Sequence, residues 1–133
     1  MNDRPTAEEL LRAVERFLEA DVVPRLEGVP KFHARVAANV VAMVAREIET
    51  ADAHERGEWL RLGALLGSDD EAPEEHEARR VALLARNQEL SERIRAGEAD
   101  AGPWRAELLA HLRHTVGDKL EVARPPRQGR QGG

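Results

Sequence analysis

The sequence contains no cysteine and no tyrosine, and its 133 residues include only two serines, Ser68 and Ser91. The absence of cysteine excludes disulfides, thiolate metal sites and cysteine nucleophiles. The motifs of dinucleotide-binding folds, phosphate-binding loops and serine-hydrolase nucleophile elbows are also absent. With so few hydroxyl groups there is little to support nucleophilic catalysis. We therefore expect a protein that is not an enzyme and needs no cofactor, although acid–base catalysis by Asp, Glu and His stays open.

Long apolar runs and basic segments are scarce as well. The longest apolar stretch covers residues 36–45 and has Asn39 inside it, whereas a membrane-spanning helix needs about 20 residues. The first nine residues carry acids where a signal peptide carries basic and then apolar residues. The formal net charge is −5. Basic residues outnumber acidic residues only in residues 122–133, so no positively charged surface for nucleic acid is expected in residues 1–121. These features predict a cytoplasmic protein that binds neither membranes nor nucleic acid.

What the sequence does contain is helical periodicity, with apolar residues recurring every three or four positions. Thr6 and Glu9 fit a capping box at the start of a first helix, which Pro24 should end or kink. A third helix follows Pro73, and the last helix follows Pro103. No segment alternates with the period of two that is typical of strands.

The second helix is the most regular of these segments. It carries an apolar stripe in steps of four residues: Phe32, Val36, Val40, Val44 and Ile48. This helix either continues past Ala51 or breaks near Gly57. The last helix has a similar stripe: Leu108, Leu112, Val116 and Leu120. We expect such stripes to be buried in a shared core.

The elements together predict an all-α fold. We expect a single bundle of four to five helices over residues 1–121, followed by a disordered basic tail over residues 122–133. The pattern leaves open whether the core closes within one chain or within a homodimer, because an Ala-rich bundle can bury a leftover stripe against a second copy.

Polar residues on the second helix form the first candidate site. This set consists of His33, Arg35, Asn39 and Arg46. Arginine recognises carboxylate and phosphate groups with its planar fork, so the set could hold an anionic metabolite or a partner protein. As a structural alternative, Asn39 could hydrogen-bond to Asn87 of the third helix and fix the register of the bundle.

A second candidate is a polar stripe on the last helix. Its members fall within about 60° of one another on a helical wheel: Glu107, His111, His114 and Asp118. Imidazole and carboxylate groups on one face can bind zinc or iron. However, the stripe lies opposite Leu108, Leu112 and Val116, on the face expected to be solvated, and it lacks the Glu-x-x-His pairs of di-iron bundles. We therefore predict no metal site and keep these four residues as a remote alternative.

Three segments carry a resemblance to a known family: residues 32–47 (FHARVAANVVAMVARE), residues 109–120 (LAHLRHTVGDKL) and the opening residues 4–11. Together they resemble a small, all-helical bacterial family of unknown function with no established catalytic residues. Its members are encoded beside, or fused to, aminoglycoside-phosphotransferase-like proteins, often near acyl-CoA dehydrogenases. The resemblance implies an accessory protein that partners a kinase-like phosphotransferase in acyl-CoA-related metabolism. An alternative stays open on the residue pattern alone. In this alternative the protein is a small ligand-binding or enzymatic bundle that recognises an anionic metabolite through the Arg and Asn residues of the second helix.

Overall fold

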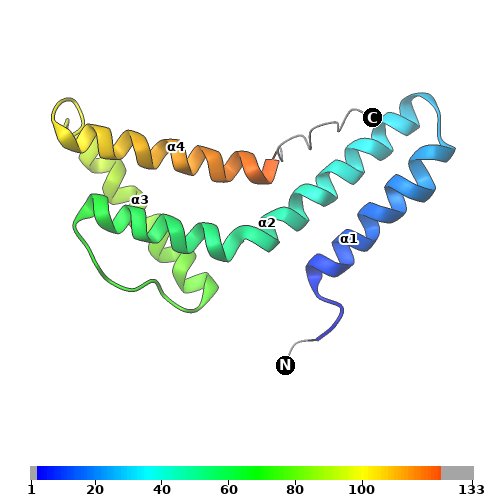
Figure 1. Cartoon of the computed structure of the whole chain (residues 1–133), viewed down its shortest axis with the longest axis horizontal. Helices are drawn as coiled ribbons and strands as arrows, with labels where there is room; N and C mark the ends of the chain where they lie inside the picture. Colours follow the sequence, from blue (N-terminus) through cyan, green and yellow to red (C-terminus); the bar gives the residue numbers. More distant parts are fainter. Residues whose placement is uncertain (1–2, 124–133) are drawn as a thin grey trace, which may run out of the picture. The chain divides into compact units, whose positions relative to one another are not determined.

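A computed structural model describes residues 3–123, and over this range the chain is all-α, without any strand. It contains four α-helices: α1 (Ala7–Phe17), α2 (Gly28–Leu66), α3 (His76–Arg95) and α4 (Pro103–Ala123) (Figure 1). The predicted fold class is therefore confirmed. Within the described residues, no helix is both long and apolar enough to cross a membrane. Val122 and Ala123 belong to α4, and the rest of the predicted tail lies outside the described residues.

The start and end of α1 follow the sequence signals. The hydroxyl of Thr6 accepts from the amide of Glu9 at 3.2 Å, and the Glu9 carboxylate accepts from the amide of Thr6 at 3.3 Å. This reciprocal capping satisfies two amides at the helix start, as predicted. After α1 the chain continues as a π-helical segment (Leu18–Val22) and then a 3-10 segment (Val23–Arg25). The α-helix is lost before Pro24, which has no amide hydrogen to donate.

Helix α2 is continuous through Gly57 and ends at Leu66, which decides between the two alternatives for this segment. It begins at Gly28, whose φ of 65° lies in the left-handed region that glycine tolerates. Gly67, with φ of 75°, follows its last residue. The helix contributes to two compact units of the chain. Within the described residues, the first unit comprises residues 3–50 and 122–123, and the second comprises residues 51–121.

In the first unit, α1 lies alongside the first half of α2 (Figure 1). Arg12 of α1 donates to both carboxylate oxygens of Glu49 on α2, each at 3.0 Å. The buried apolar side chains of this unit are small or medium in size: Val23, Ala38, Ala42 and Ala45. Alanine allows two helices to approach closely, so the contact between α1 and α2 is built on small residues.

The large apolar residues of the first unit are not buried, so the prediction that the Phe32–Ile48 stripe forms the core is wrong. Phe32 is 64% exposed and Val36 is 43% exposed. On a helical wheel this stripe lies roughly 150° from the three buried alanines. The reason is that α1 covers one face of α2, and the alanine face occupies that contact.

The second unit has a conventional core formed by the second half of α2 with α3 and α4. Its buried apolar residues are Trp59, Leu62, Leu65, Leu83, Leu90 and Leu108. The indole of Trp59 donates to the carbonyl of Asp70 at 2.7 Å, and the guanidinium of Arg86 lies 3.3 Å from the centroid of the ring. The loop between α2 and α3 is therefore fixed to the core through a tryptophan.

A buried arginine fastens the start of α3 to α2. Arg79 is 2% exposed, and it donates to Asp52 at 2.7 Å and to Glu55 at 3.0 Å. Its remaining terminal nitrogen donates to the carbonyls of Pro73 and Glu74 at 3.1 and 3.2 Å. A buried guanidinium is tolerated only when its donors are satisfied, and here two carboxylates and two carbonyls satisfy them.

Candidate functional site

Two of the four residues in the polar stripe of α4, His111 and Asp118, face α2, which corrects the expectation of a solvated face for them, whereas Glu107 and His114 are exposed. His111 is 4% exposed, and Asp118 is half-buried. The apolar residues Leu112 and Val116, expected in the core, are 40% and 54% exposed. The physical reason is Arg61 of α2. Its Nε donates to His111 Nδ1, and its Nη2 donates to Asp118 Oδ2, both at 3.4 Å.

The surroundings of His111 disfavour its charged form. Burial lowers its pKa below the usual value, and the positive charge of Arg61 lowers it further. Because Arg61 Nε donates to His111 Nδ1, Nδ1 is the acceptor and the ring proton lies on Nε2. In this tautomer the Nε2–H group of His111 can donate a hydrogen bond to a ligand.

A cavity of about 440 Å³ lies beside this histidine. The polar residues of its lining are Arg61, Glu107, His111 and His114. Leu65 and two alanines, Ala64 and Ala110, supply the apolar part. Three of the four residues singled out on the last helix therefore share one cavity with an arginine from α2.

The fourth residue, Asp118, belongs to an adjoining cluster with His54 and Glu121. His54 Nε2 lies 3.2 Å from a carboxylate oxygen of Glu121 and 3.8 Å from Asp118 Oδ1. His114 Nε2 lies 3.6 Å from the same Asp118 oxygen. His54 was not among the residues singled out from the sequence. One signal was available, because His114, Asp118 and Glu121 continue a single helical row in steps of four and three residues.

The polar set on the second helix is only partly brought together. Arg35 and Asn39 line a cavity of about 250 Å³, together with Glu19, Val23 and Ala38. Arg46 does not line it, and its Nε donates to the carbonyl of Val122 at 2.8 Å. His33 is exposed and absent from the lining.

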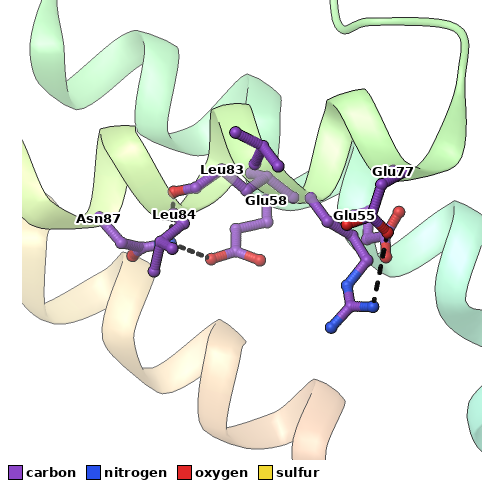
Figure 2. A pocket seen from close by; sticks show the side chains of 8 residues that line it. Glu55, Glu58, Glu77, Leu83, Leu84 and Asn87 are labelled. Atoms are coloured by element: carbon purple, nitrogen blue, oxygen red, sulfur yellow. Dashed lines mark hydrogen bonds and ion pairs between the residues drawn. The ribbon is translucent and has the colours of Figure 1, made fainter.

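The side-chain amide of Asn87 has partners within its own unit. It donates to Glu58 at 2.9 Å and to the carbonyl of Leu83 at 3.0 Å (Figure 2). Asn39 belongs to the first unit and Asn87 to the second. Their proposed pairing therefore stays a prediction.

A third cavity, of about 410 Å³, is lined by three glutamates from α2 and α3 together with apolar side chains (Figure 2). Its lining consists of Glu55, Glu58, Glu77, Arg80, Val81, Leu83, Leu84 and Asn87. Glu55 accepts from Arg79, Glu58 accepts from Asn87, and Glu77 lies 3.9 Å from Arg80. Because Glu55 and Glu77 are paired with arginines, the cavity presents less negative charge than its three carboxylates alone would give.

A family model described as a domain of unknown function, DUF6285, matches residues 24–126, well over half of the chain. The chain belongs to the DUF6285 family. Comparison with curated proteins and with solved structures found no match. The DUF6285 match spans α2, α3 and α4, so both the His111 cavity and the His54 cluster lie inside the domain.

Proposed function

We propose that this DUF6285 protein is a non-catalytic accessory protein of the cytoplasm that acts by binding a partner protein. One observation carries the proposal: rows of large apolar side chains are exposed on three helices. The exposed rows are Leu10, Val14 and Phe17 on α1, Val29, Phe32, Val36, Val40 and Met43 on α2, and Leu109, Leu112, Val116 and Leu120 on α4. Soluble monomers rarely expose large contiguous apolar patches, and such patches mark interaction sites.

The row on α2 has the form of a helix-recognition surface. Its members, from Val29 to Met43, fall within about 80° on a helical wheel and extend over about 21 Å of the helix. The spacing follows the three- and four-residue steps by which an amphipathic helix is bound in an apolar groove. The alanine face of the same helix is buried against its own unit, so this row is available to a partner.

The resemblance supports a specific partner, a kinase-like phosphotransferase in acyl-CoA-related metabolism. An accessory role also agrees with the scarcity of nucleophilic side chains in the sequence. In this proposal the phosphotransferase-like protein supplies the groove, and the DUF6285 protein supplies the helix.

The proposal is tested by co-expressing the chain with the phosphotransferase-like protein encoded beside it and measuring mass by size exclusion with light scattering. We expect co-elution at fixed stoichiometry. Val40→Glu places a charge within the α2 row and should abolish the complex. Leu60→Glu is the matched control, because Leu60 is 72% exposed and lies outside the row, and it should leave the complex intact.

Separate elution of the two proteins at micromolar concentration would refute the stable-subunit proposal. If the chain elutes alone at twice its own mass and Val40→Glu restores the monomer, the α2 row is a homodimer interface. In that case the partner of the row is a second copy of this chain.

The cavity at Arg35 and Asn39 favours a second candidate function, the recognition of a small anionic metabolite. Arg35 offers a planar donor fork, and Asn39 offers an amide beside it. Glu19 lines the same cavity and opposes a negatively charged ligand, which places this candidate second. An increase in melting temperature with millimolar phosphate or acyl-CoA, lost in Arg35→Gln, would support it, and no increase with either would refute it.

A further inference from the structure

We propose that His54, Asp118 and Glu121 form a binding site for a divalent transition-metal ion of the zinc class. The three ligand atoms lie within 4.8 Å of one another, on two neighbouring helices of the second unit. This set differs from the four residues that the sequence pattern brought together, and it shares only Asp118 with them. The site does not depend on the proposed accessory function.

The two distances from the His54 nitrogen to the carboxylate oxygens suit a tetrahedral ion. Two ligand atoms at bond lengths of about 2.1 Å from zinc lie about 3.4 Å apart in a tetrahedral site. His54 Nε2 is 3.2 Å from Glu121 Oε2 and 3.8 Å from Asp118 Oδ1. One imidazole and two carboxylates are a common donor set for such ions, and a water molecule completes the fourth position.

The local structure supports a cation at this place. Asp118 and Glu121 are spaced three residues apart on α4, so both carboxylates project from one side of the helix. Two carboxylates compensate the charge of a divalent ion.

Arg61 orients the aspartate without occupying the coordinating atom. It donates to Asp118 Oδ2, whereas the oxygen that faces His54 is Oδ1. Such partners outside the ligand set fix ligand orientation in metal sites. The positive charge of Arg61 also weakens binding, so we expect a micromolar site rather than a permanent structural zinc. His54 and Asp118 are about one-fifth exposed and Glu121 is 55% exposed, which leaves an entry path for a hydrated ion.

The test is titration of the full chain with Co²⁺ and Zn²⁺, followed by calorimetry and by the visible absorption of bound Co²⁺. We expect one ion per chain. His54→Ala and Glu121→Gln should each weaken binding by about tenfold or more, the loss expected when one ligand is removed. His76→Ala is the matched control, because His76 also pairs with a glutamate, Glu55, at 3.1 Å in the same unit. It should leave the affinity and the Co²⁺ spectrum unchanged.

Two results would overturn the proposal. One is the absence of 1:1 binding at about 100 µM Zn²⁺, a concentration that saturates a micromolar site. The other is binding that His54→Ala and Glu121→Gln leave intact. Glu121 is mostly solvent-exposed, so Glu121→Gln should retain the fold. Equal helical circular dichroism of variant and parent confirms that a lost affinity reflects a lost ligand.

Discussion

Replacing the buried Arg79 with alanine should destabilise the second unit more than any exposed charge substitution. The change removes four hydrogen bonds, leaves two backbone carbonyls without their donor, and leaves the half-buried Glu55 carboxylate with His76 as its remaining partner. Breaking a buried ion pair from one side costs about 3–5 kcal/mol. Asp52, the other carboxylate partner, is 66% exposed and can be hydrated in the variant, so we take the lower end, about 3 kcal/mol.

Urea denaturation followed by circular dichroism at 222 nm measures this loss. For a domain of this size, about 3 kcal/mol corresponds to a decrease in melting temperature of roughly 12 °C. Arg80→Ala is the control, because Arg80 is 63% exposed and lies 3.9 Å from its nearest carboxylate. It should change the free energy of unfolding by less than about 0.5 kcal/mol. A loss below about 1 kcal/mol in Arg79→Ala would show that the contacts of Arg79 do not fasten α3 to α2.

Four further substitutions test separate parts of the structure. Burial lowers the pKa of His111, so below about pH 6.5 the unfolded chain binds a proton that the folded chain does not. Stability therefore falls on acidification, by up to about 1.4 kcal/mol per pH unit, and urea titrations at pH 7.5 and 5.5 should find this slope reduced in His111→Asn. Gly63→Ala should destabilise the protein by about 1–3 kcal/mol, because the new Cβ would lie 2.6 Å from the Ser68 carbonyl oxygen. Gly117 lies in open space within α4, so Gly117→Ala should stabilise the protein by about 0.5–1 kcal/mol. Equal changes in the free energy of unfolding for the two substitutions would contradict both expectations. Thr6→Ala should cost about 1 kcal/mol through loss of the capping box, measured by thermal unfolding, and an unchanged melting temperature would be inconsistent with this cap.

The sequence located the helices well because their boundaries depend on local chemistry. Thr6 caps α1, Pro24 follows the end of its α-helical part, and Gly97 follows the end of α3 with φ of 87°. The sequence did not reveal which face of each helix is buried. In α2 the buried face carries Ala42 rather than Val40, because close packing of two helices selects small residues, which a hydrophobicity pattern ranks below large ones.

The candidate site was predictable only where it depends on one helix. Spacing alone grouped Glu107, His111 and His114, and the structure places all three on one cavity. Their orientation was not predictable, because the partner that draws His111 inward is Arg61, 50 residues earlier in the chain. His54 was missed for the same reason, since its partner Glu121 is 67 residues away.

The positions of the two tryptophans have a practical consequence for anyone who studies unfolding of this protein. Trp59 and Trp104 both lie in the second unit, and the chain has no tyrosine. Intrinsic tryptophan fluorescence therefore reports on the second unit alone, because the first unit has no tryptophan or tyrosine to excite at 280 nm or above. Circular dichroism reports on the helices of both. Coincident transitions by the two probes would mean that the chain unfolds as one cooperative body, and separated transitions would measure the stability of each unit without any introduced label.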